Sequence, residues 1–287
     1  GVDAVGQASI KTVGFGPDGR VDLQALGGLL AELGNQVACV LVQSPNYLGV
    51  LQDVAAIQAL AHKTGALTVV ACPEPLAFGL VKSPGSQGAD IVAGEGIGLA
   101  SGPSLGGPGV GLFAARSEHL RQMPGRLVGE TVDQSGRRGY VLTLSTREQH
   151  IRREKATSNI CTNQGLIALA FAIHVCLLGK SGFRRLAEIN LAKSEYLKQR
   201  LSSLRGFKLA VSGPTFNEFA IQVRGRASDA AAKLRERGIF AGVPLDQPSY
   251  ELPMLPDAEK TLLVATSERH QKADLDRLVS ALDEVCP

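Results

Sequence analysis

The sequence predicts an α/β fold in which a mainly parallel sheet with crossover helices is followed by a small C-terminal α+β domain. Two observations support this prediction. In the first half, continuous apolar runs of strand length alternate with helical segments, which is typical of parallel strands covered on both faces. Glycine is abundant at 33 residues, whereas aromatic residues make up only 5%, which suits tight strand-to-helix turns and close backbone packing. The four predicted strands are 37–42, 67–71, 89–93 and 110–114.

Helices are expected between and after these strands. Apolar spacing over 54–64 predicts a helix that Gly65 closes in the C′ position, where a positive φ is tolerated. Residues 116–155 are polar and rich in Gly and Arg, with one strand-like piece at 140–144. An apolar helix near 163–178 is expected to be buried, because its apolar run is too short to span a bilayer. Its candidate cap residues are Thr157, Ser158 and Asn159, and a second amphipathic helix follows at 181–204.

The last part of the chain is expected to form a small α+β domain. Alternation of apolar and polar residues over 216–223 predicts a strand with one face in water. The other predicted elements are strands at 207–211 and 261–266 and helices at 228–237 and 272–285. The predicted organisation is a large domain at 1–155, connecting helices at 156–205 and the small domain at 206–287.

Charge and cysteine usage exclude several classes of protein. A formal net charge of +3 is too small to indicate a nucleic-acid partner, and no aromatic residues interleave the local basic run. The cysteines are scattered, odd in number and without CxxC spacing, so they predict reduced core thiols in a cytoplasmic protein rather than disulfides or a zinc site. We expect no metal ion and no membrane partner. The cysteines are Cys39, Cys72, Cys161, Cys176 and Cys286.

Candidate ligand-binding loops follow three of the predicted strands. A sheet of this kind binds ligands at the carboxyl ends of its strands, where the loops 44–46, 72–74 and 95–101 lie. A Gly-rich segment at 102–111 follows the third loop. Neither the dinucleotide-binding nor the P-loop glycine pattern occurs there with its proper flanks. The glycines therefore indicate close backbone approach rather than a nucleotide site.

Three stretches in the middle of the chain, 121–133, 136–144 and 147–163, carry a long and specific motif. This motif resembles the signature of glycine decarboxylase P-proteins, in the version carried by the separate alpha subunit. In that subunit roughly the first third precedes this sequence, and the chain begins abruptly at Gly1. We therefore expect the natural N-terminal third to be missing. Further segments similar to the same subunit are 43–49, 75–90 and 261–285.

The resemblance implies a fold-type-I, pyridoxal-phosphate-transferase-like large domain, here incomplete. Catalytic members carry a lysine after the third strand that forms a Schiff base with the cofactor; here Gly98 lies near that position, and no lysine occurs from 83 to 154. They also place an aspartate against the pyridine nitrogen, where Cys72 stands here with Glu74 two residues on. Without an amine the chain cannot hold the cofactor covalently, so no catalytic residue is assigned. The loop residues of this degenerate cofactor site are Asn46, Cys72, Glu74 and Glu95.

A basic run, made of Arg147, Arg152, Arg153 and Lys155, precedes the candidate cap residues. Two interpretations of this run stay open. It can form ion pairs within the chain, or it can contact a partner subunit or another anion. Lys82, outside this run, is expected to be a solvated or structural residue. The acidic residues in reach are Glu130, Asp133, Glu148 and Glu154. The candidate interface or anion contacts are Arg126, Glu130, Arg147, Arg152, Arg153, Lys155, Thr157, Ser158 and Asn159.

The resemblance also implies a function. It is that of a non-catalytic subunit of the glycine cleavage system P-protein, paired with a catalytic (beta) subunit in a heterotetramer. The partner would bind pyridoxal 5′-phosphate, decarboxylate glycine and pass the aminomethyl group to the lipoyl arm of H-protein, while this chain alone would be inactive. Two alternatives remain. One is an autonomous fold-type-I aminotransferase or lyase that uses Lys82 or Lys155, and the other is a structural or interaction protein without a catalytic role.

Overall fold

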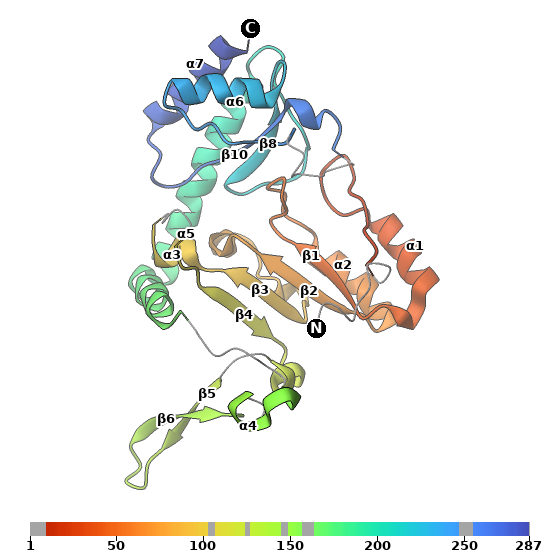
Figure 1. Ribbon diagram of the computed structural model, residues 1–287, viewed down its shortest axis with the longest axis vertical. Helices are drawn as coiled ribbons and strands as arrows, with labels where there is room; N and C mark the ends of the chain where they lie inside the picture. Colours follow the sequence, from red (N-terminus) through yellow and green to blue (C-terminus); the bar gives the residue numbers. More distant parts are fainter. Residues whose placement is uncertain are drawn as a thin grey trace.

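The computed structural model describes residues 10–102, 107–123, 127–144, 149–156, 164–246 and 255–286. These residues form two four-stranded sheets and a two-stranded arm. Figure 1 shows the first sheet in the middle of the molecule, the second near the C-terminus at the top, and the arm projecting at the bottom. Short 3-10 helices lie at Gly34–Gln36, His62–Thr64, Pro75–Gly79, Gly85–Gln87, Ser117–Gln122, Arg153–Lys155 and Ala258–Lys260.

The first sheet has the strand order β1-β2-β3-β4. β1 (Cys39–Gln43), β2 (Leu67–Cys72) and β3 (Ile91–Glu95) run parallel. β4 (Gly111–Ala115) pairs antiparallel with β3. The four predicted strands are thus confirmed, and the sheet is mainly parallel as expected, although β3 begins two residues later than predicted.

Two helices pack on this sheet. α2 (Val54–Ala61) confirms the predicted helix, and Gly65 closes it with φ +78°. α1 (Leu23–Leu33) was not predicted. Its N-cap Asp22 accepts bonds from the backbone N–H groups of the first turn, which is a recognisable start signal. Apolar residues of both helices and of the sheet form one core: Leu26, Leu30, Val42, Val54, Ile57, Val70 and Ala89.

The second sheet is antiparallel, with the order β7-β8-β10-β9. β8 (Glu218–Gln222) and β10 (Thr261–Ala265) form its centre, flanked by β7 (Lys208–Leu209) and β9 (Val243–Pro244). α6 (Ala227–Glu236) and α7 (Lys272–Val285) pack on one face and agree with the predicted helices. The prediction of a wetted face on β8 is wrong. Phe219 and Ile221 face the helices, while Ala220 on the other face packs with Leu48 and Val50 from the loop after β1.

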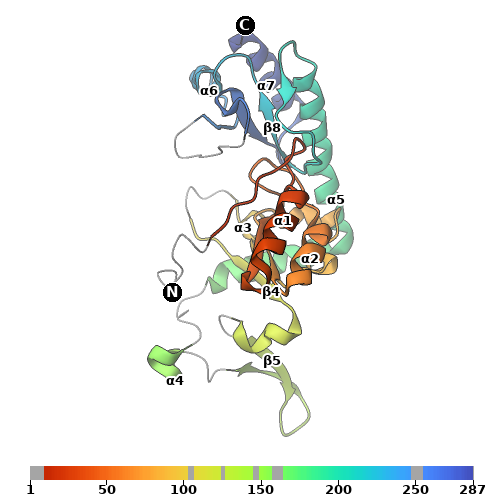
Figure 2. The same ribbon diagram turned by 90° about the vertical axis from the view of Figure 1, so that its right-hand side faces the viewer.

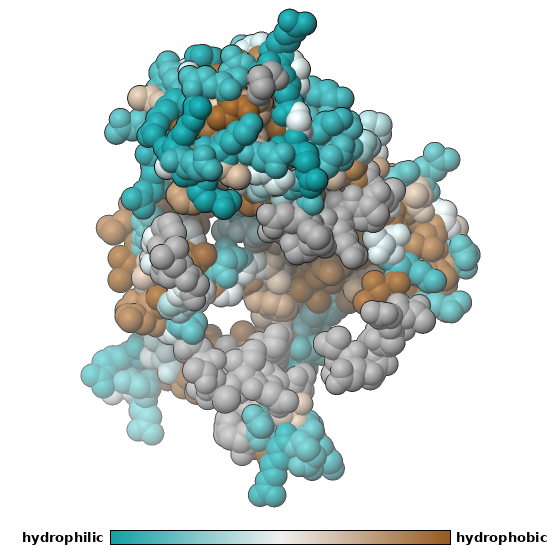
Figure 3. Space-filling view, turned by 45° about the horizontal axis from the view of Figure 1, so that its top comes forward, coloured by the Kyte–Doolittle hydropathy of each residue, from teal (hydrophilic) through white to brown (hydrophobic). Residues whose placement is uncertain are grey.

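A long helical segment, α5 (Gly165–Ser202), connects the two sheets. Gly179 has non-helical φ/ψ and breaks it into two parts, so the two predicted helices are confirmed. The expectation that the first part is buried is wrong: Leu166 and Leu177 are 78% and 81% exposed. By length and composition alone α5 could also cross a membrane, and none of its apolar window is buried within the chain. Figure 3 shows apolar side chains along the left-hand edge, where this part lies.

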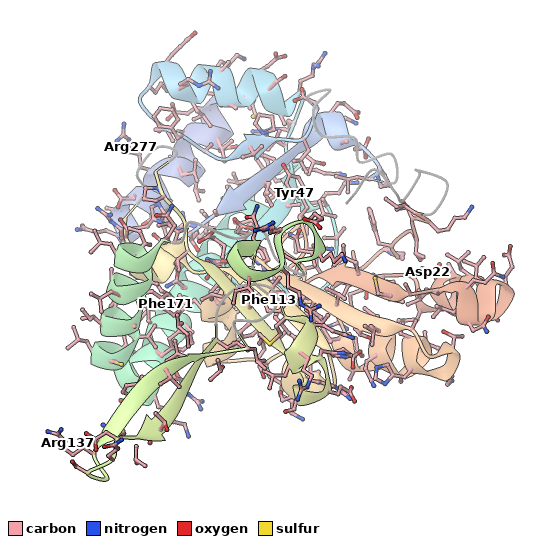
Figure 4. All side chains as sticks on the ribbon, turned by 60° about the horizontal axis from the view of Figure 1, so that its bottom comes forward. Asp22, Tyr47, Phe113, Arg137, Phe171 and Arg277 are labelled. Carbon is pink, nitrogen blue, oxygen red and sulfur yellow. The ribbon has the colours of Figure 1, made fainter. Side chains whose placement is uncertain are left out.

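The arm consists of β5 (Leu127–Val132) and β6 (Arg138–Thr143), paired antiparallel. Only β6 was predicted, because the apolar residues of β5 are interrupted by Gly129 and Glu130. α4 (Gln149–Arg152) follows the arm. Figure 2 shows the arm extending away from both sheets, and Figure 4 places Arg137 at its tip.

The prediction that the cysteines are core thiols is only partly right. Cys72 and Cys286 are buried, whereas Cys39 and Cys176 are exposed. Cys39 begins the edge strand β1, and Cys176 lies in the exposed first part of α5. Cys161 lies outside the described residues.

Candidate functional site

The loop after β1 contains the first candidate cofactor-site residue, Asn46. Its Nδ2 donates to Gly19 O (2.8 Å), and its Oδ1 accepts bonds from the backbone N–H groups of Leu48 and Val50 (both 3.0 Å). Both polar atoms of the side chain are therefore engaged by the chain's own backbone. Asn46 shapes this loop, as the Asx-type pattern of bonds indicates.

The same loop is pressed against the second sheet. Gly49 has φ +80°, and a Cβ added there would lie 2.1 Å from Glu218 O at the start of β8. Val50, which is fully buried, forms a backbone bridge with Thr215. The loop at the carboxyl end of β1 thus fastens the two sheets to each other at a spacing that only glycine permits.

Cys72 ends β2, and Glu74 follows it. Cys72 is 3% exposed, and burial raises the pKa of its thiol to about 11, so the side chain is neutral. The Glu74 carboxylate accepts hydrogen bonds from Leu76 N (3.1 Å) and from Nδ2 of Asn217 (3.0 Å). Asn217 directly precedes β8. Burial, and secondarily the negative charge of Glu268, raise the pKa of the Glu74 carboxyl above its ordinary value.

Glu95 and Gly98 occupy the third strand-end loop. Glu95 Oε1 accepts bonds from Ile97 N (2.8 Å) and Val110 N (3.0 Å), which closes the turn between β3 and α3 (Ile97–Ala100). Gly98 lies in α3, and a Cβ added there would meet nothing within 4 Å. Gly98 is exposed and has room for a Cβ.

These loops can be tested for their fit to pyridoxal phosphate, the cofactor that the resemblance implies. Such a site requires an amine for the aldehyde and an acidic partner for the pyridine nitrogen. Gly98 supplies no amine, and Cys72 supplies a buried neutral thiol. Glu74 and Glu95 already accept bonds from this chain. The residues of these three loops do not fit the cofactor. Lys82 and Lys155, the two alternative amines, are both exposed on other segments.

The basic run is only partly described by the structure. Arg152, Arg153 and Lys155 are exposed at α4 and the turn after it, and within the described residues none of the three forms an ion pair. Asp133 pairs instead with Arg137 at the arm tip (2.9 Å), and Glu130 is exposed on β5, opposite Tyr140. Arg126, Arg147, Thr157, Ser158 and Asn159 lie outside the described residues. The N-cap position of α5 is Gln164, so the cap prediction for 157–159 is wrong because the helix begins later.

Asp90 is a buried charge that the sequence interpretation missed. Its Oδ2 lies 2.8 Å from His62 Nε2 and 2.7 Å from Thr68 N, and its Oδ1 lies 3.2 Å from Arg116 Nε. Carboxylate and imidazole atoms of Asp90, Glu118 and His119 also lie within 4.8 Å of one another, close enough to hold a metal ion. Both oxygens of Asp90 are already paired, one with a guanidinium, so we interpret the group as an ion-pair network at the amino end of β3.

Comparisons with known proteins identify the relatives of this chain. The sequence model of the family described as "Glycine cleavage system P-protein" matches residues 18–282. The chain is 53% identical to a Rhodospirillum rubrum protein named "Probable glycine dehydrogenase (decarboxylating) subunit 1", over 92% of this chain and 58% of that protein. A Sorangium cellulosum protein of the same name is 48% identical, over 98% of this chain and 61% of that protein. The chain thus spans about three-fifths of the length of these relatives.

Solved structures agree with these relatives. A crystal structure of glycine decarboxylase (P-protein) of the glycine cleavage system, in inhibitor-bound form, matches with a TM-score of 0.81 and 40% identity. The match covers 88% of this chain and 56% of that one. A NifS-like protein from Rickettsia africae matches with a TM-score of 0.69 at 18% identity, which concerns the fold alone. The predicted fold class, a fold-type-I pyridoxal-phosphate-enzyme fold, is confirmed.

Proposed function

Because this chain belongs to the glycine cleavage system P-protein family, we propose that it is the non-catalytic subunit of a two-subunit glycine dehydrogenase (decarboxylating). A companion catalytic subunit binds pyridoxal phosphate and decarboxylates glycine. That subunit passes the aminomethyl group to the lipoyl arm of an H-protein. The two chains assemble as a heterotetramer in the cytoplasm.

One observation supports this division of labour above the others. The polar side chains at the three strand ends already bind the chain's own backbone or its second sheet, and the segment 83–154 contains no lysine. Cofactor chemistry needs an amine and ionisable partners that are free to turn toward the ligand. The fold of a cofactor enzyme without these groups favours a supporting subunit over an autonomous enzyme.

The role of this chain is then to contribute surface rather than chemistry. The candidate contacts from the sequence, Arg152, Arg153 and Lys155, are exposed and unpaired within the described residues. They are available to a partner, together with Glu130 on the arm.

The test is a cofactor-binding measurement combined with reconstitution. The chain is incubated with pyridoxal phosphate, reduced with borohydride, dialysed and examined by mass spectrometry. We expect no stable pyridoxyl adduct and no visible absorbance, but full glycine decarboxylation when the companion subunit and H-protein are added to a full-length version of the chain. A stoichiometric adduct on Lys82 or Lys155 would establish the autonomous enzyme instead. Failure of the full-length version to bind or activate the companion subunit would favour a role outside the enzyme.

A further inference from the structure

The two sheets meet at the loop after β2 as well as at the loop after β1. Glu74, two residues beyond β2, accepts a hydrogen bond from Nδ2 of Asn217 (3.0 Å), which directly precedes β8. The other oxygen of Glu74 accepts the backbone N–H of Leu76 (3.1 Å). Asn217 O in turn accepts the backbone N–H of Thr266, directly after β10 (2.8 Å). One carboxyl group therefore connects the first sheet to the two central strands of the second.

A second carboxyl group, that of Glu218, lies beside this contact. Side chains alternate along a strand, so Glu218 lies on the same face of β8 as Ala220, which packs on the loop after β1. Glu218 therefore faces the first sheet, and it is half-buried there. The charge of Glu74 acts on Glu218, and the charge of Glu268, after β10, acts on Glu74. Carboxyl groups from three separate segments thus meet where the two sheets touch.

Neither Glu74 nor Glu218 pairs with a lysine, arginine or histidine side chain within the described residues. Lys198 of α5 instead reaches Thr215, near the start of β8, where its Nζ donates to the hydroxyl group (2.6 Å). Burying a carboxylate without a cation is costly, so the neutral form of each carboxyl group is favoured. The other ionisable side chains around this contact are Tyr47, Cys72, Lys193, Glu195, Glu268, Arg269 and His270.

We infer that the bond between Glu74 and Asn217 is a proton-sensitive latch between the two sheets. The latch is closed while Glu74 and Glu218 hold at least one proton between them, and it opens locally once both carry a negative charge. The loop after β1 keeps its own contacts with the second sheet, because Gly49 and Val50 make them through the backbone. Opening therefore frees the loop after β2 from β8 and raises the population of a locally open form without separating the sheets.

The direction of the pH effect follows from these two carboxyl groups. Burial, and after it the charge of another acidic group, raise the pKa of both Glu74 and Glu218 above the ordinary 4.5. A carboxyl group of this kind favours the closed form fully below its ordinary pKa, and the contribution is lost as pH rises through the closed-state pKa. Each unit by which a pKa is raised changes the ratio of closed to open forms about tenfold. The latch therefore opens toward alkaline pH.

The experiment measures how fast iodoacetamide alkylates two buried thiols of this chain, with peptide-resolved mass spectrometry, at about pH 6 and about pH 8. Cys72 ends β2, two residues before Glu74, so opening of the latch should expose it. Cys286 follows α7, away from the latch, and reports global unfolding. Thiolate formation rises with pH at both thiols, so the ratio of the two rates removes that effect.

Two variants and one control separate the latch from other effects of pH. Glu218→Gln removes the charge beside the latch and keeps the bonds of Glu74, and Glu74→Gln removes the other charge. The control is Glu236→Gln, which changes the net charge equally at an exposed position of α6. In the wild type and the control we expect the ratio of the Cys72 rate to the Cys286 rate to rise about tenfold or more with pH. In Glu218→Gln and Glu74→Gln it should rise by less than about threefold.

The outcomes decide for or against the latch independently of the proposed function. An equal rise in the wild type and Glu218→Gln would overturn the latch, as would a wild-type ratio that does not change with pH. A control that behaves like Glu218→Gln would assign the effect to net charge and overturn it too. If Glu74→Gln does not fold, Glu218→Gln still decides, because the Glu218 side chain forms no hydrogen bond within the described residues. The companion subunit takes no part in these measurements, so failure of the latch leaves the proposed function intact.

Discussion

Gly49 offers the sharpest test of how the loop after β1 joins the two sheets. Its φ is +80°, and a Cβ added there would lie 2.1 Å from Glu218 O and 2.5 Å from the carbonyl carbon. Both atoms are backbone of β8, so a rotamer change cannot relieve the overlap. Gly49→Ala should therefore force the loop and the second sheet apart.

Two other glycines serve as matched controls. Gly65 has nearly the same conformation, φ +78°, but a Cβ there would meet nothing within 4 Å. Gly65→Ala should then lower the free energy of unfolding only by the cost of placing alanine in the left-handed conformation, about 1–2 kcal/mol. Gly98 has neither a positive φ nor a close neighbour, so Gly98→Ala within α3 should be neutral or stabilise by about 0.4–1 kcal/mol. Gly49→Ala has the same cost of a left-handed conformation and, in addition, an overpacking cost of about 1–3 kcal/mol. Its total loss of unfolding free energy should therefore be about 2–5 kcal/mol.

The assay is denaturant and thermal unfolding of the three variants beside the wild type. For a chain of this size the Gly49→Ala cost corresponds to a fall in Tm of roughly 5–15 °C. The order of stability should be Gly98→Ala highest, Gly65→Ala lower and Gly49→Ala lowest. If Gly49→Ala costs no more than Gly65→Ala, the close contact between the loop and β8 does not exist, and the loop does not fasten the sheets.

Three further predictions concern the degenerate site and the basic run. Gly98→Lys should fold, since the position is open, but should not decarboxylate glycine, because Cys72 remains a neutral thiol; measurable turnover would refute this. Burial raises the pKa of Glu74 above its usual 4.5, so the folded state retains this proton to higher pH. Stability should be full below about pH 4.5 and fall as pH rises through the folded pKa, and Glu74→Gln should flatten that profile of Tm against pH; an unchanged slope would contradict the assignment. Arg152→Ala with Arg153→Ala should weaken binding to the companion subunit while changing the free energy of unfolding by no more than about 0.5 kcal/mol; lowered stability with unchanged binding would assign the run to internal ion pairs.

Local periodicity was sufficient to predict most of the fold. The buried strands of the first sheet are short apolar runs with clear boundaries, and α7 matches its predicted range because its apolar positions and polar flanks are regular. α1 was missed because its sequence contains Gly27 and Gly28, which are poor helix formers, although Asp22 marks its start. β5 was missed because strand pairing with β6 overrides the low propensity of Gly129 and Glu130.

Burial could not be predicted from the same patterns. β8 alternates apolar and polar residues, yet Gln222 is buried and its Nε2 donates to Pro256 O (3.1 Å). The first part of α5 has the composition of a core helix but lies exposed on one side. Sequence alone does not separate a core from an interface, because both remove the same apolar side chains from water. The role of Asn217 at Glu74 depends on a contact between distant segments and has no local signal.

The strand-end carboxylates show why the loops cannot serve both structure and cofactor. Turning Glu74 toward a ligand would leave Leu76 N and the Asn217 amide without their acceptor, and turning Glu95 would do the same to two more backbone N–H groups. A buried donor without a partner costs about 1–3 kcal/mol. The four bonds here lie at part-buried positions, so breaking all of them would cost at most about 4–12 kcal/mol, against about 5–15 kcal/mol for the whole stability of a typical domain. Binding of a small ligand would have to supply that energy before it contributed any affinity. The loops are therefore fixed as parts of the scaffold, and this supports placing the reactive groups on the companion subunit and the contribution of this chain in the surfaces that it presents.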